Sequence, residues 1–318
     1  MTPTSQHRRR EAVIKARDSV PLATEQQNPS SARLDAMSAL EIARLMNAED
    51  AKVAPAMRKA LPQIARAIDL IARVLERGGR LIYVGAGTSG RLGVLDAAEC
   101  PPTFSADPEL VQGIMAGGEQ ALAHATETTE DDPAIGARDL RERGFTARDV
   151  LVGIAASGRT PYVLGAVAEA RRLGAVTAGI SCTPDSELAR AVHIAITPLA
   201  GPEIVAGSTR MKAGTATKLV LNMLSTATFI RLGYVYGNLM VNVQPNNTKL
   251  RDRATRIVAQ AAGVTNEVAE VMLEAAGNKV ATAIVMAKTG ANREAAEQRL
   301  AAANGRISKA LGTTDEHR

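Results

Sequence analysis

The chain of 318 residues contains no tryptophan, and aromatic residues make up only 2% of it. Proteins that bind single-stranded nucleic acids stack bases on aromatic side chains, so this scarcity argues against that class. The two cysteines, Cys100 and Cys182, are too few for a disulfide framework or a cysteine-rich zinc site. The four histidines are isolated along the chain and are not spaced as metal ligands. The sequence therefore predicts a protein with no metal ion and no other cofactor.

Long apolar runs are also missing. No stretch approaches the roughly 18–20 uncharged residues that a membrane-spanning helix needs, and the N-terminus lacks the apolar core of a secretory signal. The apolar fraction of 46% and the charged fraction of 22% are typical of globular proteins. We expect a cytoplasmic protein without a membrane partner.

The net charge of +5 is concentrated at the N-terminus, where the first 20 residues carry five basic and two acidic side chains. The rest of the chain is close to neutral. A solvated basic tail explains this distribution, and a weak electrostatic contact is the less favoured alternative. The charge therefore predicts no nucleic-acid partner.

The apolar pattern predicts an α/β fold with a doubly wound, mostly parallel sheet of five strands flanked by helices. We expect a mobile basic tail over 1–22, an arm with a short helix over 23–54, the α/β domain over 55–245 and an all-helical module over 246–318. The expected strands are 80–85, 109–115, 148–155, 175–181 and 193–197. The expected helices are 88–98, 118–143 with a break at Pro133, 160–173, 185–190, 209–232 and 248–262, followed by short helices up to 313, one of them capped by Thr265.

Apolar side chains recur every three or four residues between Pro55 and Arg77. This spacing predicts one long amphipathic helix with a seam like that of a coiled coil. Such a seam usually packs on another helix, so it suggests a homodimer.

Two expected strands run into small, hydroxyl-rich loops. The first loop carries Thr88, Ser89 and Gly90, and the second carries the run Ser157-Gly158-Arg159-Thr160. Each loop leads into a helix, whose N-terminal N–H groups and positive potential favour an anion. Because parallel strands end at one edge of a sheet, the two loops predict a phosphorylated small molecule held from two sides.

Two other interpretations of these loops remain open. The run from Gly85 to Gly90 matches G-x-G-x-x-G, which occurs in dinucleotide-binding folds. Such a site needs an acidic residue at the end of the second strand, but Glu119 comes only after two glycines. Alternatively, the glycines and hydroxyls serve only as tight turns and helix caps.

Two glutamates could carry acid–base chemistry. Glu99 precedes Cys100-Pro101-Pro102, and we expect the prolines to end the helix and fix Glu99 at a rigid corner. Glu130 belongs to an acidic cluster that could equally cap a helix beginning near Asp132. Spacing alone does not bring the two glutamates together. Cys100 is a poor candidate nucleophile, since no histidine lies nearby in the sequence.

Four motifs together resemble the N-acetylmuramic acid 6-phosphate etherase family of SIS (sugar isomerase) domain proteins. They are the runs 85–104, 153–162, 207–215 and 237–243, and the likeness extends from Thr24 to the C-terminal helices. The resemblance implies the SIS fold and cleavage of the D-lactyl ether of N-acetylmuramic acid 6-phosphate, a step of peptidoglycan recycling. Lactate is eliminated and water then adds, giving N-acetylglucosamine 6-phosphate and D-lactate.

The resemblance also implies residue roles. Glu99 would be the proton donor to departing lactate and Glu130 the partner base, the assignment of the two roles being open. The substrate-binding candidates are Thr88, Ser89, Gly90, Ser157, Gly158, Arg159 and Thr160, with Glu203, Ser208, Arg210 and Lys212 as further candidates. Two alternatives share the fold: a non-catalytic sugar-phosphate-binding regulator, similar to glucokinase regulatory protein, and an aldose–ketose isomerase.

Overall fold

A parallel sheet of five strands forms the centre of the protein in a computed structural model, which describes residues 24–124, 129–243 and 248–312. The strands are β1 (Leu81–Gly85), β2 (Val111–Met115), β3 (Val150–Ile154), β4 (Val176–Ile180) and β5 (Ile194–Ile196), in the order β2-β1-β3-β4-β5. Gly85 pairs with both Met115 and Ile154, so three strands end level at one edge. The predicted fold class is confirmed.

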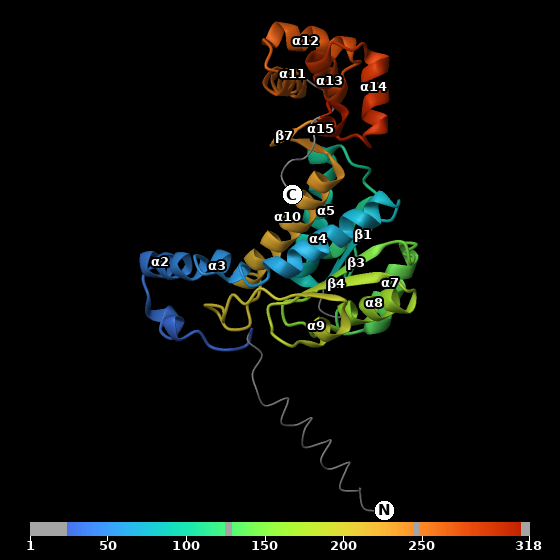
Figure 1. Cartoon of the computed structure of the whole chain (residues 1–318). Coiled ribbons are helices and arrows are strands. Elements are labelled where there is room, and N and C mark those ends of the chain that lie inside the picture. The colour runs from blue at the N-terminus through green and yellow to red at the C-terminus, as the bar shows by residue number, and fades with distance from the viewer. Residues whose placement is uncertain (1–23, 125–128, 244–247, 313–318) are drawn as a thin grey trace, which may run out of the picture.

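Helices cover both faces of the sheet, as Figure 1 shows. On one face, Ile71 of α4 and Val220 of α10 share a core with Tyr83 of β1. On the other face, the core joins Ile82 of β1 to Val163 of α8. Because both faces are buried, the strands are apolar almost throughout. The helices before and within this layered body are α2 (Ala39–Asp50), α3 (Val53–Met57), α4 (Leu61–Glu76), α5 (Gly87–Phe104), α6 (Gln120–Ala123), α7 (Pro133–Glu142), α8 (Pro161–Arg172), α9 (Glu187–Ala191) and α10 (Lys212–Leu232), preceded by the 3-10 turns Pro29–Ser31 and Leu34–Ala36.

The C-terminal helices have a hydrophobic core of their own and stand at one end of the molecule (Figure 1). Arg306 ties them to the body: its guanidinium lies 2.8 Å from the Glu76 carboxylate and 2.8 Å from the Arg231 carbonyl oxygen, to which it donates a hydrogen bond. Thr265 caps α12, as predicted. The helices are α11 (Thr248–Ala262), α12 (Asn266–Ala275), α13 (Val280–Thr289), α14 (Arg293–Ala302) and α15 (Ile307–Ala310).

The single helix expected over 55–77 is wrong. The segment forms α3 and α4, with a turn between them and Pro62 in the first turn of α4. Proline has no N–H and clashes with the carbonyl four residues earlier, so a continuous helix would be broken there. The apolar seam of α4 packs against α10 and the sheet of the same chain. It therefore no longer supports a dimer.

Two other expectations also need correction. The helix expected to end at 98 continues as α5 to Phe104, with Pro101 and Pro102 inside its last turns and Ser105 ending it in a left-handed conformation. The fixed proline φ of about −65° is compatible with a helix, so the chain stays helical through Pro101 and Pro102 although these residues cannot donate the backbone hydrogen bonds. The loop expected from Gly237 contains β7 (Leu239–Met240), which pairs with β6 (Val235–Tyr236). The helix expected over 118–143 is reduced to the single turn α6 and to α7, which begins at Pro133. Residues 124 and 129–132 between them are not helical.

The basic tail predicted over 1–22 lies outside the described residues. Within the part that is described, no helix is both long enough and apolar enough to cross a membrane.

A buried carboxylate, Asp149, links the segments that precede β1 and β3. It forms an ion pair with Arg80 at 2.9 Å and accepts hydrogen bonds from the backbone N–H groups of Arg80 and Thr146. Burial acts to raise the pKa of Asp149, but these partners outweigh it and lower that pKa below its ordinary value. A lowered pKa stabilises the fold above the pKa of the unfolded carboxyl, and this stabilisation is lost as the pH falls through the folded-state pKa.

We expect Asp149→Asn to lower the free energy of unfolding by about 3 kcal/mol at pH 7, since it leaves a half-buried guanidinium without its counter-charge. The difference from the unaltered protein should shrink at pH 3, where the unaltered carboxyl also begins to protonate. Urea unfolding at both pH values measures this. Glu142→Gln, which removes an exposed carboxylate next to Arg138, is the control and should change little. Equal losses at both pH values would contradict this assignment.

Candidate functional site

The first predicted loop, Thr88 to Gly90, forms the first turn of α5 directly after β1, and the second loop follows β3, so both lie at the carboxyl edge of the sheet on adjacent strands. The start of α5 packs tightly on the end of β1, because a methyl group at Gly90 would lie 2.7 Å from the carbonyl oxygen of Gly85. Gly158 has φ +68°, and a methyl group there would lie 2.2 Å from the Ser186 hydroxyl. A side chain at either position would clash with its neighbours, so both positions require glycine.

The helices that follow these loops begin without a side-chain cap. Neither Ala86, before α5, nor Thr160, before α8, accepts a hydrogen bond through its side chain from the first turn of its helix. By contrast, Ser186 caps α9 and Asp132 caps α7. Two helix N-termini without side-chain caps and with positive potential therefore face one edge of the sheet. This arrangement suits a phosphate monoester.

The N-terminus of α10 also reaches this region, since a methyl group at Gly214 would lie 3.6 Å from the Thr88 side chain. The carboxylate of Glu203 caps this helix, accepting hydrogen bonds of 2.9 Å from the N–H groups of Lys212 and Ala213. Because a carboxylate already neutralises this end, α10 does not offer an anion the same site as α5 and α8.

Two of the further candidates, Glu203 and Lys212, do not line an open cleft, because both side chains are buried. Lys212 Nζ lies 2.6 Å from Glu49, which is also buried. Burial acts to raise the pKa of Glu49, but hydrogen bonds from Lys212 and other donors lower it to about 2. The Glu49 carboxylate therefore stays charged, and its contact with Lys212 fastens the N-terminal arm to α10. Of the other two, Ser208 is half-buried and Arg210 is exposed, in the turn that precedes α10.

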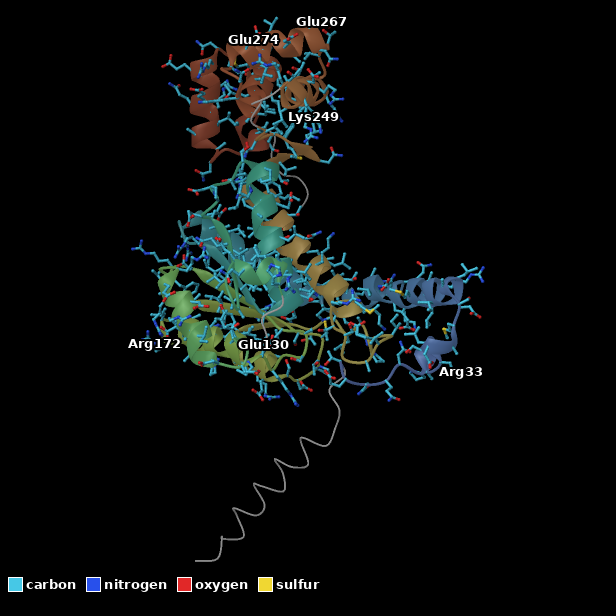
Figure 2. The ribbon with its side chains drawn as sticks, turned by 180° about the vertical axis from the view of Figure 1, so that it is seen from behind. Arg33, Glu130, Arg172, Lys249, Glu267 and Glu274 are labelled. Carbon is cyan, nitrogen blue, oxygen red and sulfur yellow. The ribbon has the colours of Figure 1, made fainter. Side chains whose placement is uncertain are left out.

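Glu130 lies at the same edge as the loops. Its backbone carbonyl accepts a 3.0 Å hydrogen bond from the N–H of Tyr162, in the first turn of α8, and its side chain is half-buried. Arg91, in the first turn of α5, donates to the carbonyls of Leu122 and His124, which lead toward Glu130. Figure 2 shows Glu130 at this end of the body, away from the C-terminal helices that carry Lys249. The rest of its acidic cluster, up to residue 128, lies outside the described residues.

Glu99 lies elsewhere. Val94, in the middle of α5, packs on Gly113 in the middle of β2, so Glu99 lies past the other end of that strand. It is ten residues beyond Ser89 in the same helix, a rise of about 15 Å. Within one chain, the structure brings the two loops and Glu130 together but does not bring Glu99 to them.

Glu99 lines a groove between α5 and α10 with a volume of about 410 Å³. Asp96 is the most buried acid in this groove and accepts hydrogen bonds from the hydroxyls of Tyr83 and Ser225, at 3.0 and 3.1 Å. Burial raises the pKa of Asp96 despite these bonds. Lys218 of α10 also lines the groove. The sequence did not predict this groove because the helix expected over 88–98 stopped before Glu99. The spacing of Leu92, Asp96 and Glu99 could have revealed it.

A second cavity, of about 590 Å³, runs along β2, the edge strand of the sheet. Its lining includes Gly117, Gly118 and Thr129, so it reaches the backbone next to Glu130. Within the described residues, no group of three or more His, Cys, Asp or Glu side chains could hold a metal ion.

We expect Gly158→Ala to destabilise the fold by roughly 3 kcal/mol, because it combines a left-handed φ with a clash against Ser186. The matched control is Gly174→Ala, whose φ is +82° but whose added methyl group meets nothing within 4 Å. The control should lose only about 1–2 kcal/mol. Thermal unfolding of the two variants measures the difference. Equal losses would show that the second loop has room to adjust.

Comparison with known proteins places the chain in a family. Residues 63–171 match the model of the glucokinase regulatory protein N-terminal SIS domain, and residues 139–227 match the SIS domain model. Three relatives share the name N-acetylmuramic acid 6-phosphate etherase. The one from Aeromonas hydrophila is 55% identical over 81% of this chain and 87% of its own length. The one from Gloeobacter violaceus is 56% identical over 81% of this chain and 85% of its own. The one from Streptomyces avermitilis is 54% identical over 88% of each.

These identities extend over most of both chains. The chain therefore belongs to the N-acetylmuramic acid 6-phosphate etherase family of SIS-domain proteins.

Proposed function

We propose that the protein cleaves the D-lactyl ether of N-acetylmuramic acid 6-phosphate, giving N-acetylglucosamine 6-phosphate and D-lactate, in the recycling of cell-wall sugars. Membership of the etherase family supports this proposal. The structural observation that carries it is the pair of uncapped helix N-termini at adjacent strands. They would bind the 6-phosphate, with Thr88, Ser89 and Gly90 on one side and the run from Ser157 to Thr160 on the other.

The elimination step needs two proton transfers, and the addition of water reverses them. In the open-chain sugar the C1 aldehyde acidifies the proton on C2. A carboxylate base removes this proton, the C3–O bond breaks, and lactate leaves with a proton from an acid. Water then adds across the C2–C3 double bond, its hydroxyl going to C3 and a proton returning to C2. We assign Glu130 as the base and Glu99 as the acid that protonates lactate. No metal ion or redox cofactor forms part of this proposal.

The substrate also bears on the assembly and location of the protein. The phosphate on the loops and the ether at C3 belong to one hexose, so Glu99 must reach the sugar that the loops hold. We propose that the protein is a homodimer, and that it acts in the cytoplasm on a small phosphorylated sugar, with no nucleic acid or membrane as partner.

Two other functions would use the same loops. A regulator would bind sugar phosphates without turnover, and an isomerase would interconvert aldose and ketose phosphates. The groove carrying Glu99 and Lys218 favours the etherase, because a second acidic group is needed to protonate the leaving lactate.

We expect the protein to release D-lactate from N-acetylmuramic acid 6-phosphate, and in D₂O the product should carry deuterium at C2. An enzymatic lactate assay, run with and without a chelator, measures release. Sugar-phosphate binding without lactate would favour the regulator, and hexose phosphate interconversion would favour the isomerase.

Glu99→Gln and Glu130→Gln should each lower kcat by about 100-fold or more, the usual contribution of a general acid or base. Glu274→Gln, on the exposed face of α12, is the matched control and should leave kcat unchanged (Figure 2). A variant that kept full activity would remove its glutamate from the mechanism.

A further inference from the structure

The helix α13, one of the C-terminal helices, begins without a side-chain cap. Its first three N–H groups, at 280–282, have no acceptor within the helix, and Lys279 at the cap position supplies none through its side chain. The neighbouring helices differ, because Thr265 caps α12 and Asn292 caps α14. A helix end of this kind attracts an anion, but by itself it does not make a site.

A buried hydroxyl without a partner lies in the same turn. Thr282 has only 3% of its surface exposed, and its hydroxyl has no hydrogen-bond partner among the residues that the structure describes. Thr289, near the other end of the helix, shows the usual arrangement, since its hydroxyl donates a 2.7 Å hydrogen bond to the carbonyl oxygen of Val285. A buried hydroxyl without a partner destabilises the fold. A ligand that accepts its hydrogen bond would remove that cost.

Thr282 lines a cavity that also includes the N-terminus of α13. The cavity has a volume of about 440 Å³, which falls within the size range of small-molecule sites. Its other walls are Ser105, which ends α5, and the segment 241–243, which follows β7. The cavity therefore lies where the C-terminal helices meet the body, next to β7 in Figure 1.

The charge beside this cavity is positive. Among the described residues that line it, Lys279 has the one charged side chain. Arg293 lies close by, because a methyl group at Gly277 would lie 2.7 Å from its guanidinium. Lys279 and Arg293 share one carboxylate, that of Glu297, at 3.0 and 3.1 Å. Two cations and one carboxylate leave an excess of positive charge, to which the dipole of α13 adds.

We propose that this cavity binds a phosphate group, held by the first N–H groups of α13, the Thr282 hydroxyl and the Lys279 ammonium. A phosphate has enough acceptor oxygens for all three kinds of donor. The volume also leaves room for a small group attached to the phosphate. Inorganic phosphate and the phosphate ester of a small molecule are therefore two sources of the same chemistry. This site is separate from the two loops and does not depend on the reaction proposed above.

Hydrogen–deuterium exchange read by mass spectrometry tests the proposal, because a peptide covering 276–284 reports on this helix end apart from the loops. We expect about 10 mM inorganic phosphate to slow exchange in this peptide about tenfold for a Kd near 1 mM, compared with sodium chloride of equal ionic strength. A second arm uses N-acetylglucosamine 6-phosphate. The compound that protects at the lower concentration identifies the source, and no protection by either would overturn the proposal.

Two variants separate binding from folding. Thr282→Val keeps the shape of the side chain but removes the hydroxyl, so we expect the affinity for phosphate to fall about tenfold or more. Without phosphate its melting temperature should stay the same or rise, because no hydrogen bond within the protein is lost. Lys279→Gln should weaken binding about threefold, since its ammonium is exposed.

The matched control is Lys288→Gln, an exposed position in the last turn of the same helix, which should leave the affinity unchanged. Unchanged affinity in Thr282→Val would overturn the proposal. A Thr282→Val protein that lost stability without phosphate would show instead that the hydroxyl serves the fold, which would also overturn it. The lactate assay tests the proposed reaction separately, on the unaltered protein.

Discussion

The length of α5 is the constraint on which the rest of the account depends. The helix begins in the first loop, where Gly90 packs against Gly85, and runs past the amino end of β2 before Ser105 ends it. A helix cannot shorten, so everything on it keeps its spacing. Ser89 belongs to the anion-binding edge and Glu99 to the far groove.

The three helix N-termini at this edge differ in whether a side chain caps them. Those of α5 and α8 are left without side-chain caps, whereas that of α10 is closed by the buried carboxylate of Glu203. The buried pair of Lys212 and Glu49 then holds the N-terminal arm against α10. Buried charges of this kind are costly unless they are paired, and here each has its partner. These buried pairs hold the arm and α10 in place. The N-termini of α5 and α8 have no side-chain cap and can bind a ligand.

The sequence predicted the sheet because burial on both faces leaves its strands apolar almost throughout. It also predicted the C-terminal helices. The loops could be predicted because their hydroxyls and glycines follow those strands directly. The wrong predictions concerned helix bounds at prolines and the packing partner of α4. Pro62 broke a helix that periodicity alone joined, whereas Pro101 and Pro102 were tolerated near the end of another. The seam of α4 found its partner within the chain, which periodicity cannot reveal.

The position of Glu99 relative to the loops depended on the true length of α5, which the sequence interpretation cut short at residue 98. In the structure, Glu99 lies in the same helix as Ser89, about 15 Å from it along the helix axis. A crystal structure with a bound open-chain sugar phosphate tests this account most directly. The account predicts that the phosphate contacts the first turn of α5 and the loop from Ser157 to Thr160. A phosphate bound away from both would contradict it.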